Sequence, residues 1–238
     1  MPQGDIVGLL IMATVAGLAM PAGAILATYQ GIQSKWLEKE LRHGILALGA
    51  GALISAVGLV LVPDGIKDVS VFAAIACFVG GALAFMALDI YLAKKQTAGS
   101  QLAAMLSDFV PESIALGTTA ALGGGTMLLG LLIAVQNLPE GFNAYREMLP
   151  KNKQRSTKLI LLFIGMALLG PLFSLVGFYY LAQFPVIMSG IMLFAAGGIL
   201  YSVFQDIAPQ IRMENHWLPP LGGILGFLVG MIGFMLEG

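Results

Sequence analysis

Long apolar stretches dominate the chain, and polar residues gather mainly in the short segments between them. A helix needs about 20 predominantly apolar residues to cross a bilayer. Eight segments meet this requirement, and we expect each to be a membrane-spanning helix: 5–29, 43–63, 71–93, 100–122, 126–149, 159–182, 186–211 and 218–237. The pattern therefore predicts an all-α polytopic membrane protein, in which residues 1–238 form a single transmembrane domain.

The composition supports a membrane protein and excludes a soluble one. Hydrophobic residues make up 58% of the chain and charged residues 11%, whereas soluble proteins have roughly 25% charged residues. The net charge of -1 gives no general attraction to nucleic acid. The N-terminus lacks the basic segment of a cleavable signal peptide, so we expect the first apolar run to be retained as a span.

The distribution of basic residues predicts an orientation. Lys67 is expected on one side of the membrane, and the remaining 11 of the 12 Lys and Arg residues on the other. Basic residues favour cytoplasmic loops, so that second side is predicted to be cytoplasmic and both termini to lie outside. The residues assigned to the cytoplasmic side are Lys35, Lys39, Arg42, Lys94, Lys95, Arg146, Lys151, Lys153, Arg155, Lys158 and Arg212.

An internal repeat relates the two ends of the chain. Residues 44–63 align without a gap on residues 190–209, and VGGALAF at 79–85 resembles LGGILGF at 221–227. The copies lie five spans apart and therefore cross the membrane in opposite directions, which predicts a 3+2+3 arrangement with inverted repeats in spans 1–3 and 6–8. Inverted repeats are typical of secondary transporters. The alternative is the general likeness of helices rich in Gly and Ala. The identical pairs are Gly44/Gly190, Ile45/Ile191, Ala50/Ala196, Gly51/Gly197, Val57/Val203 and Pro63/Pro209.

Two related polar motifs lie in the fourth and fifth spans, which Gly123 to Gly125 join by a predicted tight turn. DFVPES places Asp108 and Glu112 four residues apart, and QNLPEG gives the same spacing to Gln136 and Glu140, with Asn137 beside them. Residues four apart share one face of a helix. Carboxylates near mid-bilayer are costly and must face partners or water.

The motifs together predict a cation site. Three potential negative charges in a confined place repel one another unless a cation or protons are bound. Pro111 and Pro139 remove backbone donors and free the carbonyls of Ser107 and Val135, which we expect to open the helices. The alternative is a hydrogen-bonded polar seam that orders the bundle.

Further polar residues are candidates for a cation pathway. Gln205 and Asp206 precede Pro209 in the seventh span, and Asp64 follows Pro63 at the outer end of the second. We expect Asp206 to join the cluster or line its cytoplasmic approach, and Asp64 to attract cations at an entrance. Asp89 is expected at the membrane interface and is assigned no role.

These features resemble the ZIP (Zrt-/Irt-like) family of divalent-metal transporters. QNLPEG matches the family's fifth-span pattern [HQ]-[ND]-x-P-E-G, and the resemblance implies Gln136, Asn137 and Glu140 as metal ligands. DFVPES matches the fourth-span pattern H-N-x-P-E-G only at Pro111 and Glu112. The family has eight spans, external termini, an inverted three-span repeat and a metal site on spans 4 and 5.

Two departures bear on the ion that the resemblance implies. Asp108 stands in place of the family's histidine, so the ligands would be oxygen and amide groups, which are less biased toward zinc. Phe109 stands in place of the family's asparagine, which in the family helps to hold a second metal, so a binuclear site is in doubt.

We therefore expect a permease for divalent cations such as zinc, iron(II) or manganese, which moves them toward the cytoplasm through a site of Asp108, Glu112, Gln136, Asn137 and Glu140. It would lie in the cell (inner or plasma) membrane, act on metal as substrate without a cofactor, contact lipid but no nucleic acid, and have a homodimer as a candidate assembly. It would not be an enzyme; neither G-x-x-x-x-G-K-[ST] nor G-x-G-D occurs in the sequence. The alternatives are a non-transporting ZIP-like sensor or subunit, and an intramembrane acid hydrolase.

Overall fold

The computed structural model describes residues 5–28, 35–94, 98–149, 156–211 and 219–237, which form helices joined by short turns. No strand occurs within these ranges, so the all-α prediction is confirmed. The far ends of two expected spans, at residues 29 and 218, lie outside the described residues.

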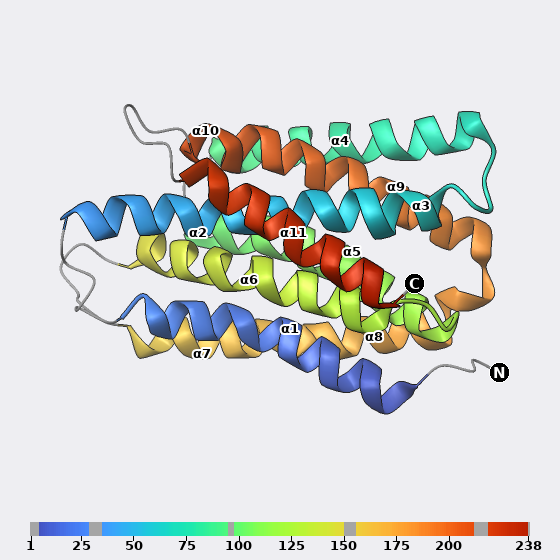
Figure 1. The fold of residues 1–238 in the computed structure, drawn as a ribbon, viewed down its shortest axis with the longest axis horizontal. Helices are drawn as coiled ribbons and strands as arrows, with labels where there is room; N and C mark the ends of the chain where they lie inside the picture. The colour runs from blue at the N-terminus through green and yellow to red at the C-terminus, as the bar shows by residue number, and fades with distance from the viewer. Residues whose placement is uncertain (1–4, 29–34, 95–97, 150–155, 212–218, 238) are drawn as a thin grey trace.

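The helices lie alongside one another as a bundle (Figure 1). In chain order they are α1 (Ile6–Leu26), α2 (Lys35–Ala56), the π-helical turn η1 (Val57–Leu61), α3 (Val62–Gly65), α4 (Val71–Ala93), α5 (Ala98–Ala121), α6 (Thr126–Met148), α7 (Thr157–Ala167), α8 (Leu169–Tyr179), the 3-10 turn η2 (Leu181–Gln183), α9 (Pro185–Ser202), the π-helical turn η3 (Val203–Ile207), α10 (Ala208–Ile211) and α11 (Pro219–Glu237).

Six helical segments of the described chain are long and apolar enough to cross a membrane, which identifies a polytopic membrane protein. Helices α5 and α6 are also long, at 24 and 23 residues, but their polar motifs make them less apolar. The six segments are Ile6–Leu26, Arg42–Gly65, Val71–Ala93, Thr157–Gln183, Pro185–Ile211 and Pro219–Leu236.

Successive long helical segments of the bundle run in opposite directions (Figure 1). The loops at its two ends carry different residues. We call one the basic end, because Arg42, Lys94, Arg146 and Lys158 lie there. At the other, the triglycine end, Gly123 to Gly125 join α5 to α6; Gly123 has φ +75°, a conformation that other residues rarely adopt. Five further basic residues assigned to the basic side lie outside the described residues: Lys95, Lys151, Lys153, Arg155 and Arg212.

The two segments of the proposed repeat share an unusual backbone feature. A five-residue π-helical turn precedes Pro63 in the first copy and Pro209 in the second. In each turn the next backbone N–H bonds the carbonyl five residues earlier, at Val57 and at Val203. A proline ring clashes with the carbonyl four residues before it, and the wider turn relieves that clash.

The prolines of the two polar motifs do not interrupt their helices. Pro111 lies inside α5 and Pro139 inside α6, and both helices continue past them. The expectation that these prolines open the helices is therefore wrong, because each removes only one hydrogen bond from a helix that neighbours hold on several sides. Pro171 acts differently: the sixth expected span is divided at Leu168 into α7 and α8.

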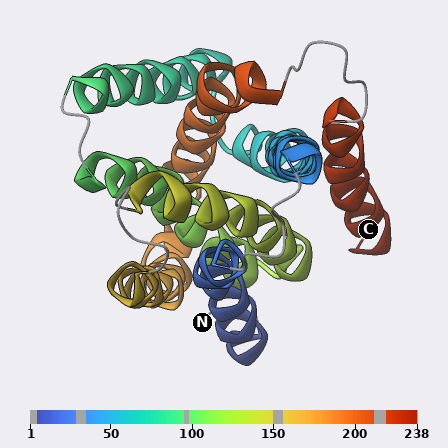
Figure 2. The same ribbon diagram turned by 90° about the vertical axis from the view of Figure 1, so that its left-hand side faces the viewer.

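Glycines allow the main helix pairs to touch through their backbones. A Cβ atom at Gly51 of α2 would meet the Gly223 carbonyl of α11, and one at Gly197 of α9 would meet the Phe78 carbonyl of α4. The same kind of contact joins α1 to α6 and α5 to α8. Figure 2 shows α11 beside α2 and α4 beside α9. Small residues at helix contacts are typical of membrane bundles, where lipid is as apolar as leucine.

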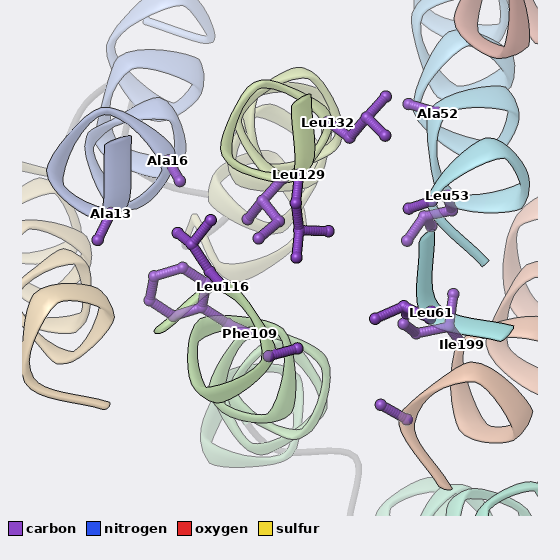
Figure 3. Packing of buried hydrophobic residues seen from close by; sticks show 14 of the residues in the cluster. Ala13, Ala16, Ala52, Leu53, Leu61, Phe109, Leu116, Leu129, Leu132 and Ile199 are labelled. Carbon is purple, nitrogen blue, oxygen red and sulfur yellow. The ribbon is translucent and has the colours of Figure 1, made fainter. Parts of the chain in front are cut away.

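The apolar core runs along the bundle and closes the half nearer the triglycine end. Leu116 of α5, Leu129 and Leu132 of α6 and Leu61 of η1 are at most 1% exposed. Their side chains lie between the helices in Figure 3. The half nearer the basic end is less completely filled, and the candidate site lies there.

Replacing Gly51 with alanine should destabilise the bundle, because its Cβ would meet the Gly223 backbone. We expect the free energy of unfolding to fall by about 1–3 kcal/mol, the usual cost of overpacking. Gly44→Ala, on the same helix, is the matched control, since a Cβ at this position would meet nothing within 4 Å. Thermal unfolding in detergent measures both. Equal stability of the two variants would show that this close contact is not important.

Candidate functional site

A cavity of about 390 Å³ lies in the basic half of the bundle, between α2, α4, α5, α6 and the segment from α9 to α10. Its wall runs from Asp108 and Gln136, near the middles of α5 and α6, to Glu147 and Gln210 near the basic end. Other lining residues include Leu46, Leu53, Leu92, Ala93, Met105, Ile199 and Ile207, so an apolar surface carries a few polar groups.

Three residues of the predicted site line this cavity: Asp108, Gln136 and Glu140. Because Gln136 and Glu140 are one helical turn apart, both face the same side of α6. Asp108 reaches the cavity from α5, the antiparallel neighbour of α6. The structure thus brings the two motifs together, as their sequence spacing predicts.

Glu112 is held directly behind the cavity wall by a buried hydrogen-bonded pair. Its side chain is 2% exposed, and Gln136 Nε2 donates to both Oε1 and Oε2 of Glu112 at 2.6 Å. A bidentate, charge-assisted contact of this kind fixes the carboxylate and joins α5 to α6. The amide also turns Gln136 Oε1 away from the carboxylate.

Two oxygen atoms of the site are buried without a hydrogen-bond partner among the described residues. They are Asp108 Oδ1 and Gln136 Oε1. Buried polar atoms are almost always hydrogen-bonded, and each exception calls for a ligand, ion or water. These two oxygens are therefore free to coordinate a cation.

The carboxyl groups of the site act on one another electrostatically. Glu140 lies within range of the charges of Asp108 and Glu112, and Asp108 within range of Asp206. Like charges in a poorly solvated place raise the free energy of the fully ionised state. A bound cation would relieve that repulsion, and so would a proton.

Asn137 lies apart from this cluster. Its Nδ2 donates to the carbonyl of Ala16 on α1 at 2.9 Å, and the residue does not line the cavity. Its Oδ1 has no partner among the described residues. Phe109, the corresponding position of the other motif, is 1% exposed and faces Gly170. The second residue of each motif therefore contacts the α1 and α8 side.

The predicted pathway residues fall in different places. Asp206 lines the cavity, whereas Gln205 is exposed and does not. Asp64 lies at the other end of the bundle, where Lys67 Nζ donates to its Oδ1 at 2.6 Å. This hydrogen bond, with the charge of the same carboxylate, raises the pKa of Lys67. Asp64 thus already has a counter-ion.

Several cavity residues were not anticipated from the sequence. Asp89 of α4, which the sequence predicts at the membrane interface with no role, lines the cavity and accepts a hydrogen bond from Tyr201 Oη at 3.3 Å. Asn143 and Glu147 follow Glu140 along the same face of α6. That spacing of three and seven residues was the available signal, because it is the period of one helical face.

The geometry is not that of a preformed metal centre. In the part of the chain that the structure describes, no three His, Cys, Asp or Glu side chains converge as a group able to hold a metal ion. Coordination would instead combine carboxylate oxygens with amide oxygen such as Gln136 Oε1, after small side-chain movements. Oxygen donors of this kind suit hard divalent cations.

No family model matches the chain, and no curated protein does.

Removing the Gln136 side chain should leave Glu112 buried without its donor. We expect Glu112 and Gln136 to be coupled by about 1.5–3 kcal/mol in a double-mutant cycle of alanine substitutions, because the hydrogen bonds involve a charged acceptor. Thermal unfolding of the metal-free protein measures the coupling. Asn137→Ala is the control and should cost about 1 kcal/mol, whichever residue occupies position 112. Additive effects at 112 and 136 would contradict the pairing.

Proposed function

We propose that this protein is a secondary transporter of divalent metal cations and a divergent member of the ZIP family. Asp108, Glu112, Gln136 and Glu140 would form the mid-membrane site, with Asn137 available only after its side chain leaves Ala16. The cargo would be a hard or borderline divalent ion such as manganese, iron(II) or zinc. No chemical step on the ion is required, so the protein would not be an enzyme.

The unpartnered oxygens of Asp108 and Gln136 are the observation that carries this proposal. Asp108 and Gln136 both line a cavity within a bundle of apolar helices, beside two more carboxyl groups. A polar seam built only to hold helices together would satisfy its own hydrogen bonds and would not need several acidic groups. Ionisable residues within a membrane usually mark a transport pathway.

Eight spans in a 3+2+3 arrangement are part of the proposal. The π-helical turns before Pro63 and Pro209 lie 146 residues apart, the same offset as Gly51 and Gly197, and both glycines contact a neighbouring helix backbone. The helix pairs follow the same relation: α2 packs on α11 as α9 packs on α4. These correspondences support an inverted repeat around α5 and α6.

The mechanism would be alternating access in which the repeats move against α5 and α6. The cavity reaches the basic end, while buried leucines close the way from Glu112 to the triglycine end. With the basic end cytoplasmic, as the positive-inside rule predicts, this arrangement is the inward-facing state. Net movement would be from outside the cell membrane to the cytoplasm, driven by the ion gradient, the membrane potential or a coupled proton.

A non-transporting sensor or subunit is the second candidate. One observation favours a non-transporting subunit: among the described residues no three acidic, His or Cys side chains form a ready metal centre. A sensor would bind metal without moving it. Flux into sealed vesicles separates the two functions, whereas binding alone does not.

Glu112→Ala and Glu140→Ala should each reduce uptake of Mn²⁺ into proteoliposomes to the level of empty vesicles. Each substitution removes a carboxylate that we assign to the cargo site. Asp68→Ala, an exposed acid at the triglycine end, is the control and should transport normally near 1 M salt, where its charge is screened. Competition by Zn²⁺, Fe²⁺ and Co²⁺ would rank the cargo ions. Undiminished uptake by both glutamate variants would exclude the proposed site.

Lys67→Gln should increase the initial rate of Mn²⁺ uptake in right-side-out vesicles roughly twofold at about 10 mM ionic strength, where the Debye length is about 30 Å. The substitution unmasks Asp64 at the proposed entrance. The gain should vanish near 1 M salt, where charges are screened within about 3 Å. Lys158→Gln makes the same charge change at the basic end and should have no such effect. An increase in uptake rate that does not depend on salt concentration would contradict the electrostatic role.

A further inference from the structure

A polar stripe leads from the candidate site to the basic end of the bundle. Gln136, Glu140, Asn143 and Glu147 succeed one another at intervals of four, three and four residues on one face of α6, and all four line the cavity. We call these four residues the α6 stripe. At a rise of about 1.5 Å per residue, Glu147 lies roughly 10 Å along the helix from Glu140. A cation leaving Glu140 would therefore pass Asn143 and Glu147.

Arg42 of α2 already occupies the outer part of this stripe. Its Nε donates to Asn143 Oδ1 at 2.9 Å, and its Nη2 lies 3.7 Å from Glu147 Oε1. The second contact is an ion pair, because it is too long for a direct hydrogen bond. The Arg42 and Glu147 side chains are 33% and 46% exposed, so they lie at the mouth and not in the core.

A second hydrogen bond of Asn143 orients its amide oxygen toward Arg42. Asn143 is 8% exposed, and its Nδ2 donates to the carbonyl of Pro139 at 3.0 Å. The amide oxygen is consequently directed to the guanidinium and not to the cavity. Close packing of Gly49 on Pro139 holds α2 against α6 one or two turns away.

We propose that Arg42 keeps the mouth of the cavity from trapping the cargo, a role that rests on the proposed transport function. Asn143 Oδ1 and Glu147 Oε1 are the type of oxygen pair that binds divalent cations. The guanidinium occupies both and neutralises Glu147. A cation released from Glu140 then meets no second binding position on the α6 stripe and leaves toward the basic end.

Arg42 is a positioning residue in this role, because it acts on Asn143 and Glu147 and not on the cargo. A purely structural tether between α2 and α6 would need the same contacts, so loss of stability cannot distinguish the two roles. The number of ions bound per chain can, since a tether does not hide a binding position.

The test counts Mn²⁺ bound to the purified full-length chain in detergent, by the electron paramagnetic resonance signal of free Mn²⁺, and follows release after dilution. The unsubstituted protein should bind one ion, and Glu140→Gln should lose it. Arg42→Gln should bind a second ion and release Mn²⁺ roughly two- to fivefold more slowly, the effect of losing one partly exposed charge pair. Arg42→Lys, which keeps the charge, should bind one.

Reversal provides the matched control. Arg42→Gln combined with Glu147→Gln should return to one ion and normal release, because the exposed oxygen pair is gone. Glu147→Gln alone leaves the guanidinium charge at the mouth and should speed release; it also tests the idea should Arg42→Gln fail to fold. One Glu140-dependent ion in both the unsubstituted protein and Arg42→Gln, with equal release, would overturn the role of Arg42. Absence of any Glu140-dependent ion would instead overturn the proposed function.

Discussion

Direct contact between helix backbones is the constraint on which the rest of this structure depends. Surrounded by lipid, helices gain little from covering apolar side chains, so they must pack closely enough for dispersion forces to hold them. The glycines at 51, 197, 23 and 117 provide that approach, each with the backbone of a partner helix where a Cβ would stand. They divide the bundle into tightly paired helices: α2 with α11, α9 with α4, α1 with α6 and α5 with α8. Looser packing is left where the pairs meet one another, and the cavity lies there.

This division explains how the bundle accommodates buried acids. Where two helix backbones touch at a glycine there is no room for a carboxylate or its water, and the buried Glu112 lies where two pairs meet. The Glu112–Gln136 contact bridges α5 and α6, which belong to different pairs. Arg42 likewise joins α2 to α6 across such a boundary. These two polar contacts therefore connect units that the glycine contacts leave separate, and both would have to change if those units move.

The sequence predicts the helices closely and the site in part. The span 71–93 coincides with α4, because apolar run length and flanking turn residues determine a membrane helix almost alone. The one-turn spacing of Gln136 and Glu140 correctly places both on the cavity wall. Adjacent residues of a motif do not share a site, because neighbours on a helix point about 100° apart. Gln136 and Asp108 face the cavity. The residues next to them, Asn137 and Phe109, face α1 and α8 respectively. The contribution of Arg42 depends on helices α2 and α6 meeting in space, and a single sequence gives no measure of that contact.

The two proposed repeat copies share a backbone conformation but carry different side chains at corresponding positions. That difference has an energetic consequence. At the constant offset of 146 residues, Asp206 corresponds to Val60 and Gln210 to Asp64. The copy near the basic end thus places an acid and an amide on a cavity wall, whereas its counterpart has a buried valine and an aspartate paired with Lys67. Exchange of the two backbone conformations would open a passage at the triglycine end lined by fewer hydrated groups. In the proposed alternating-access cycle, water and cations would stabilise the state open at the basic end more than its counterpart, so the two states would differ in free energy despite the proposed symmetry of the repeats. If the protein is the proposed transporter, it would therefore rest open at its basic end, and binding of an ion at the triglycine end would be needed to favour the other state.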